Sequence, residues 1–103
     1  MSIYGTTVVN VKKTPNYDVY IGRPSEFGNP FVIGKDGDRE TVIEKFKQYV
    51  FKEKPVLILR ARTKLRGKRC GCYCAPKACH GDPLKEWADS EPGTIQIGEG
   101  RFV

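Results

Sequence analysis

Short runs of β-branched and aromatic residues predict strands in four parts of the chain. Residues 6–11 and 17–21 are rich in Val, Ile, Thr and Tyr, which favour extended backbone. Residues 68–73 follow a glycine and carry cysteines at every second position, so that these side chains share one face of a strand. Residues 94–97 alternate between polar and apolar side chains and predict a last strand.

Residues 23–37 interrupt this pattern. Proline and glycine stand at five of these positions: Pro24, Gly28, Pro30, Gly34 and Gly37. Because such residues break regular structure, the segment predicts an ordered loop with at most a short extended piece at residues 31–33.

A helical period begins after Asp38, which predicts an N-cap for a helix that ends near Phe51. One face of this helix has hydrophobic residues at helical spacing: Val42, Ile43, Phe46, Tyr49 and Val50. The spacing predicts that this face is buried.

Two shorter segments also carry helix signals. Asp82 predicts an N-cap, and Pro83 suits the first helical position, with Leu84 and Trp87 on one face. The apolar residues 56–59 follow Pro55 and predict either a short helix or a buried strand. Strands interleaved with helices indicate a single α/β or mixed α+β domain over residues 1–103, with a short sheet and two or three helices.

The composition agrees with one small folded domain and excludes other classes. Hydrophobic residues make up 39% of the 103 residues, which suffices for a modest core. No apolar run approaches the ~20 residues of a membrane span. Residues 1–5 have neither the basic stretch nor the apolar stretch of a signal peptide, so we expect a cytoplasmic location.

The net charge of +6 is concentrated in one decapeptide, residues 60–69. Without its six basic residues, 12 basic residues would balance 12 acidic ones. A concentrated positive charge predicts an anionic partner such as nucleic acid, and a merely solvated face is the alternative. The six residues are Arg60, Arg62, Lys64, Arg66, Lys68 and Arg69.

Three cysteines and the single histidine of the chain lie within nine positions: Cys72, Cys74, Cys79 and His80. Tetrahedral zinc accepts such a set, and reducing conditions favour metal binding over disulfides for clustered thiols. The sequence therefore predicts a zinc site made of these four residues. Cys70 is an alternative ligand, because Cys79 and His80 are adjacent and their side chains can point apart.

Two other interpretations of this cluster stay open. Cys79 and His80 precede a predicted helix N-terminus, which lowers a thiol pKa and suits a catalytic nucleophile with an acid/base partner. Alternatively, the thiols are inert and pack like small apolar residues.

Several segments resemble the domain of unknown function 4326 family of small bacterial and phage proteins. The resemblance runs from about residue 8 to residue 87 and includes Phe27-Gly28-Asn29-Pro30-Phe31 and the Cys72 to Asp82 segment. Cys70 stands where the family usually has an aliphatic residue, and Tyr73 stands where it usually has tryptophan. The family's biochemical role is not established, so the resemblance implies no activity.

Polar residues recur in the resembling segments and predict a ligand site: Asn10, Asp18, Arg23, Asn29 and Asp82. At the carboxyl ends of strands in an open α/β sheet, such residues suit a nucleotide, with Arg23 on the phosphate. The alternative for each is local, as a turn residue, an ion pair or a helix cap.

Three hypotheses of function follow from the sequence. The first is a zinc-binding module whose segment 60–69 binds nucleic acid or another anionic partner. The second is an enzyme that acts on a nucleotide or modified base through Cys79 and His80. The third is a phage-encoded inhibitor of a host protein in the bacterial cytoplasm.

Overall fold

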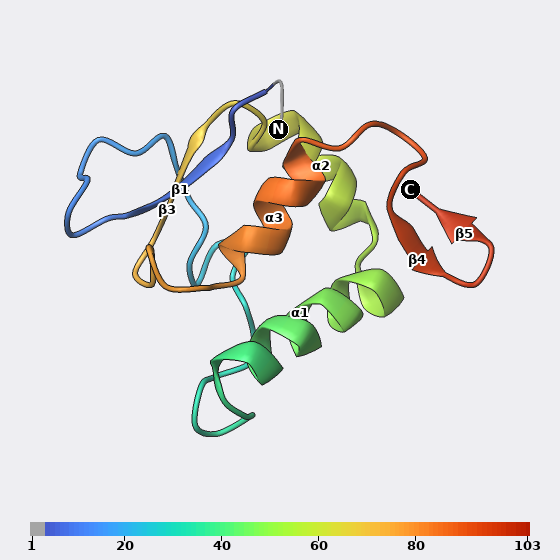
Figure 1. Cartoon of the computed structure of the whole chain (residues 1–103), viewed down its shortest axis with the longest axis horizontal. Helices are drawn as coiled ribbons and strands as arrows, with labels where there is room; N and C mark the ends of the chain where they lie inside the picture. Colours follow the sequence, from blue (N-terminus) through green and yellow to red (C-terminus); the bar gives the residue numbers. More distant parts are fainter. Residues whose placement is uncertain (1–3) are drawn as a thin grey trace.

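A three-stranded parallel sheet forms one side of the molecule (Figure 1). Its strands are β1 (Thr7–Asn10), β2 (Val19–Tyr20) and β3 (Arg69–Cys72), in the order β1-β3-β2. The computed structural model describes residues 4–103, so the first residues of the segment considered for a signal peptide lie outside it. The three strands confirm the predictions for residues 6–11, 17–21 and 68–73, although β2 is shorter than expected.

Parallel pairing brings the carboxyl ends of all three strands to one edge of the sheet. Cys70 of β3 lies opposite Val8 of β1 on one side and Val19 of β2 on the other. Val11 N–H donates to the Cys72 carbonyl at 2.9 Å, which continues the pairing beyond β1. The chain segments that follow β1, β2 and β3 therefore start close together.

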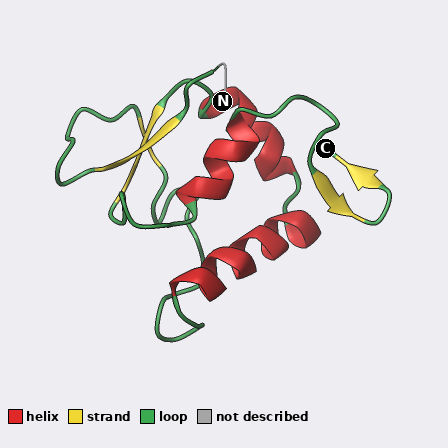
Figure 2. Cartoon of the chain, viewed as in Figure 1, coloured by secondary structure: helices red, strands yellow, loops and turns green. Residues whose placement is uncertain are grey.

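Three helices lie beside the sheet: α1 (Arg39–Glu53), α2 (Val56–Lys64) and α3 (Gly81–Ala88) (Figure 2). Of these, α3 contacts β1. The α1 prediction is confirmed, since the Asp38 carboxylate accepts a hydrogen bond from Thr41 N–H at 2.9 Å. Val42, Phe46 and Val50 are buried as expected, while Ile43 and Tyr49 are half-buried.

Residues 56–59 belong to α2, so the helix alternative is correct. Leu57, Ile58 and Ala61 are buried, and α2 packs against α3. The basic segment 60–69 thus begins within a helix that has a buried face. This placement constrains where its side chains can go.

An aromatic cluster joins α1 to α3. The Trp87 ring centroid lies 6.0 Å from that of Phe46 and 5.7 Å from that of Phe51. Aromatic pairs at this separation stabilise a fold by about 0.5–1.5 kcal/mol beyond area burial. Trp87 is 2% exposed, so this cluster is part of the core.

Residues 23–37 form a loop, as predicted, and residues 31–33 form no strand. Asn29 Oδ1 accepts from Phe31 N–H and Asp36 Oδ2 accepts from Val32 N–H, which holds this segment in turns. One local prediction, the start of the last helix, is wrong. Asp82 is not the N-cap of α3, because the helix begins at Gly81 and His80 takes the cap position. Asp82 lies in the first turn instead.

The chain ends in an antiparallel hairpin of β4 (Gln96–Gly98) and β5 (Arg101–Phe102). The strand predicted at residues 94–97 corresponds to β4, while β5 is too short to show a period. The molecule is therefore a small mixed α/β domain with a parallel sheet, three helices and a separate hairpin. Within residues 4–103, no helix is long and apolar enough to cross a membrane.

We expect the ion pairs of Glu26 to stabilise the fold above about pH 4.5 and to stabilise it less at lower pH. Hydrogen bonds from Arg60 and Lys64 lower the pKa of Glu26 to about 2 from its ordinary 4.5. A lowered folded-state pKa adds stability above pH 4.5, and this stability is lost as the pH falls towards 2. Glu26→Gln should lower the free energy of unfolding at pH 7 by about 0.5–1 kcal/mol, measured by urea titration.

Glu99→Gln, in the exposed turn of the hairpin, is the matched control and should change stability by less than about 0.5 kcal/mol. The difference between Glu26→Gln and the wild type should shrink between pH 4.5 and pH 3. An unchanged difference over this range would contradict the assignment.

Candidate functional site

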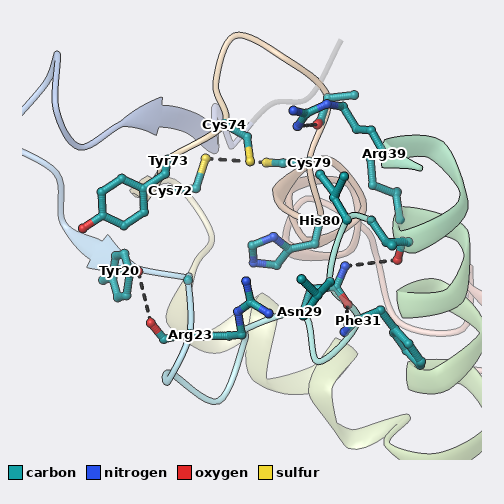
Figure 3. A pocket seen from close by; sticks show the side chains of 16 residues that line it. Tyr20, Arg23, Asn29, Phe31, Arg39, Cys72, Tyr73, Cys74, Cys79 and His80 are labelled. Atoms are coloured by element: carbon teal, nitrogen blue, oxygen red, sulfur yellow. Dashed lines mark hydrogen bonds between the residues drawn. The ribbon is translucent and has the colours of Figure 1, made fainter. Parts of the chain in front are cut away.

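A cavity of about 410 Å³ opens at the carboxyl edge of the sheet. Gly22 and Arg23 follow β2, and Tyr73 and Cys74 follow β3, so the strand ends supply one wall (Figure 3). The first two turns of α1 and the loop before it supply the opposite wall. We call this cavity the edge pocket.

Cys72 and Cys79 form a close thiol pair on the wall of the edge pocket. Their Sγ atoms are 3.5 Å apart, and both residues are buried (Figure 3). Cys72 ends β3, and Cys79 lies two residues before α3. Gly81 permits this approach, because a Cβ there would lie 3.1 Å from Cys79 Sγ and 2.9 Å from the Ile21 side chain.

The two thiols differ in their electrostatics. The hydrogen bond with Cys79, together with backbone N–H groups of Ala75 and Cys74, lowers the pKa of Cys72 to about 6, although burial opposes this. The same contact and burial raise the pKa of Cys79. Gly81 N–H donates to Cys79 Sγ at 3.3 Å, so one backbone donor faces Cys79 and two face Cys72. This arrangement favours the thiolate at Cys72 over the thiolate at Cys79.

Cys70 has a different role from the other cysteines. It is 2% exposed, packs in the hydrophobic core, and burial raises the pKa of its thiol to about 11. Cys72 and Cys79 belong to the same core cluster, but they also line the edge pocket, whereas Cys70 is not among the residues that line it. The inert-thiol alternative therefore fits Cys70 best. Cys74 is half-buried and lines the edge pocket.

The His80 ring is held in one orientation by its surroundings. Its Nε2 lies 2.7 Å from the Ile21 carbonyl oxygen, and its ring packs edge-on against Phe46 at 5.4 Å. A carbonyl only accepts, so Nε2 carries the hydrogen. Burial, aided by the positive charge of Arg23, lowers the pKa of His80, so the ring is neutral and Nδ1 is unprotonated.

The four predicted zinc ligands are not assembled into one group. Among residues 4–103, no three or more His, Cys, Asp or Glu side chains are grouped so that they could hold a metal ion. Cys72 and Cys79 come together, but the Nε2 of His80 faces the Ile21 carbonyl.

Asn10 and Asp18 bind the protein's own backbone. Asn10 Nδ2 donates to the carbonyls of Tyr73 and Ala75, at 3.2 and 3.0 Å, and so holds the loop after β3. Asp18 accepts from Arg69 N–H at 2.8 Å and pairs with the Arg69 guanidinium. Both contacts agree with the local alternative.

Asn29 and Asp82 also have local partners, whereas Arg23 does line the edge pocket. Asn29 lines the pocket too, but its Nδ2 donates to the Val42 carbonyl at 3.0 Å. Asp82 Oδ2 accepts from Cys79 N–H at 3.2 Å and so fixes the backbone at the thiol pair.

Two of the six basic residues of segment 60–69 bind backbone carbonyls. Arg62 is 9% exposed and donates to Ser90 Oγ and to the carbonyls of Glu91 and Val103. Arg66 donates to the carbonyls of Ala88 and Ser90, at 2.8 and 2.6 Å. These two arginines fasten the chain after α3 to α2.

The remaining basic residues lie at the surface. Arg60 and Lys64 pair with Glu26, and Arg69 pairs with Asp18 at 3.4 Å. Lys68 is exposed. The decapeptide is therefore not one continuous face of unpaired cations.

Sequence reasoning missed several residues of the edge pocket. Arg39 lines it from the first turn of α1 and donates to the Ala78 carbonyl at 3.0 Å. Phe31 and Tyr20 also line it. The proximity of Arg39 to the residues after β3 depends on how α1 packs, and no local sequence signal reports it.

These features define a small α/β protein with a ligand-sized pocket and a thiol pair at the carboxyl edge of a parallel sheet. The chain belongs to the family of the domain of unknown function DUF4326, which matches residues 8–90 and so confirms the resemblance.

The chain is also similar to an uncharacterised 12.4 kDa protein of Enterobacteria phage T4, from the nrdA-td intergenic region. The two are 46% identical over 78 residues, which cover 73% of this chain and 69% of the phage protein. No solved structure matches the chain.

We expect Asn10→Ala to loosen the loop that carries Tyr73 and Ala75. The substitution leaves two backbone carbonyls without their donor and should lower the free energy of unfolding by about 1–3 kcal/mol, measured by urea titration. Asn16→Ala, in an exposed loop, is the matched control and should stay within about 0.5 kcal/mol of the wild type. Equal effects of the two substitutions would show that Asn10 does not hold the loop.

Proposed function

We propose that this protein is a small enzyme that binds a nucleotide or modified base in the edge pocket and acts on it with the Cys72 thiolate. The observation that carries the proposal is the meeting of two arginines, aromatic side chains and a polarised thiol in one cavity.

The size and lining of the edge pocket suit a ligand with an aromatic part and an anionic part. A cavity of about 410 Å³ lies within the range of small-molecule sites. Phe31 and Tyr73 offer ring surfaces to a base, and Tyr73 is 59% exposed. Arg23 and Arg39 offer guanidinium groups to a phosphate.

Cys72 and His80 have complementary chemical roles in this proposal. The thiolate of Cys72 is a nucleophile for an electrophilic carbon of the base. His80 Nδ1 has a free lone pair, because Nε2 donates to the Ile21 carbonyl, and so accepts a hydrogen bond or proton. In this proposal the nucleophile is Cys72 rather than Cys79, which the sequence predicted, and Cys79 is its hydrogen-bond partner.

We expect nucleoside monophosphates to bind more tightly than the matching nucleosides, as measured by isothermal titration calorimetry with a panel of bases. Arg23→Gln should weaken monophosphate binding at least about tenfold and leave nucleoside binding unchanged, because it removes a charged donor to phosphate. Cys72→Ser should retain binding but abolish any conversion of the nucleotide, followed by chromatography.

Arg101→Gln, on the distant hairpin, is the matched control for lost positive charge. If this variant lost as much affinity as Arg23→Gln, the binding would be non-specific. If no member of the panel bound, the proposal would fail.

A zinc-binding module is the second candidate function. The observation in its favour is the 3.5 Å separation of the two sulfurs, close to the ~3.8 Å between two thiolates on one tetrahedral zinc. The other two ligands would be Cys74 and His80. For Nε2 of His80 to bind the metal, the ring would have to leave the Ile21 carbonyl.

This candidate predicts about one zinc per chain in protein purified without chelator, measured by elemental analysis. Cys79→Ser should lose the metal, whereas Cys70→Ser should keep it, because Cys70 is not among the residues that line the edge pocket. Zinc well below one equivalent in the wild type would contradict the candidate.

The remaining interpretations stay predictions. Nucleic-acid binding would use Lys68 and the outer parts of Arg60, Lys64 and Arg69, since Arg62 and Arg66 bind backbone carbonyls. Binding to a host protein and a location in the bacterial cytoplasm also remain predictions. Salt-dependent binding of labelled nucleic acid is the measurement for the first of these.

A further inference from the structure

We propose that Cys72 and Cys79 form a reversible dithiol–disulfide pair that exchanges with a small anionic disulfide, of the glutathione type, entering through the edge pocket. This activity goes beyond nucleotide binding, and it rests on the sulfur geometry rather than on the proposed function.

The positions of the two sulfurs carry the inference. A disulfide requires about 2.05 Å between sulfurs, so the pair at 3.5 Å has to close by only about 1.5 Å. Cys72 is the last residue of β3, and Cys79 lies outside α3. Each side chain therefore sits at the end of an element, where a small rotation disturbs little regular structure.

The access route agrees with an anionic partner. Cys72 and Cys79 are only 2% and 3% exposed, yet both line the edge pocket. A reagent that enters this pocket meets both sulfurs and the side chains of Arg23 and Arg39. The carboxylates of a glutathione-type disulfide are complementary to these guanidinium groups.

The hydrogen bonds at the pair set the order of events. Backbone N–H groups of Cys74 and Ala75 favour a thiolate at Cys72, whereas one backbone N–H, that of Gly81, donates to Cys79, so Cys72 is the sulfur that attacks. Cys72 bonds to one sulfur of the incoming disulfide, the original S–S bond breaks, and the first thiolate leaves. Cys79 then gives its proton to that thiolate and attacks Cys72 Sγ, which releases the second thiolate.

The exchange balances without any further reactant. Two protein thiols are oxidised to one disulfide, and the small disulfide is reduced to two thiols. Cys72 gives its proton to solvent before it attacks, and the second released thiolate takes up a proton from solvent. An excess of the small thiol reverses both steps and restores the dithiol.

The other two cysteines differ from this pair. Cys70 is as buried as the pair, but its Sγ lies 3.9 Å from the Lys68 carbonyl oxygen and Cys70 is not among the residues that line the edge pocket. Cys74 is more exposed than Cys72 or Cys79. If exposure alone governed the reaction, Cys74 would react first and would keep a glutathionyl group.

The test is to incubate chelator-treated full-length protein with oxidised glutathione, block the free thiols, digest with trypsin and map the peptides by mass spectrometry. Cleavage after Arg69, Lys77 and Lys85 separates residues 70–77 from residues 78–85. We expect the intact chain to lose about 2 Da, and these two peptides to be joined by one disulfide. Reduced glutathione should reverse the change.

Variants identify the partner within residues 70–77. Cys74→Ser and Cys70→Ser should give the same cross-link, whereas Cys72→Ser should abolish it and leave Cys79 free or glutathionylated. Far-UV circular dichroism checks that each variant folds. Where one does not, fragmentation of the joined wild-type peptides identifies which cysteine of residues 70–77 is cross-linked.

The proposal is overturned if the wild-type peptides are not joined, if only Cys74 is glutathionylated, or if Cys74→Ser removes the cross-link. None of these outcomes depends on nucleotide binding. A failed nucleotide titration beside an intact cross-link would remove the proposed function and leave this inference standing.

Discussion

β3 lies between β1 and β2, and its parallel pairing with both places the carboxyl ends of three strands at one edge. Everything at the edge pocket depends on this arrangement. Cys72 ends the central strand, Arg23 follows β2, and the Asn10 side chain at the end of β1 holds the loop after β3. A register shift of one residue would turn Cys72 away from Cys79 and separate these groups.

Part of the positive charge of the chain has a structural role. Arg62 and Arg66 satisfy backbone carbonyls at the end of α3 and beyond it, where the helix itself has no more donors to offer. A guanidinium suits this task because it has five donors in one plane. Some basic residues of segment 60–69 therefore hold the C-terminal part of the chain against α2.

The two proposals and the zinc candidate all involve the thiol pair Cys72–Cys79. A thiolate at Cys72 attacks a carbon of a bound base, attacks the sulfur of a small disulfide, or binds a metal ion. The arginines Arg23 and Arg39 favour anionic reagents in the edge pocket, which restricts what reaches the buried sulfurs. The three possibilities exclude one another at any one moment, because they use the same lone pairs.

The sequence by itself determined the elements and the chemistry-bearing residues, because these depend on local periods and residue types. The helix after Asp38, the strands β1, β2 and β3 and the loop at residues 23–37 were all predicted, while the parallel pairing of the strands and the start of α3 were not. Only the tertiary structure decided the partners. It separated His80 from the sulfurs, placed Cys70 in the core and brought Arg39 to the edge pocket, because side-chain contacts between distant segments follow from packing rather than from spacing.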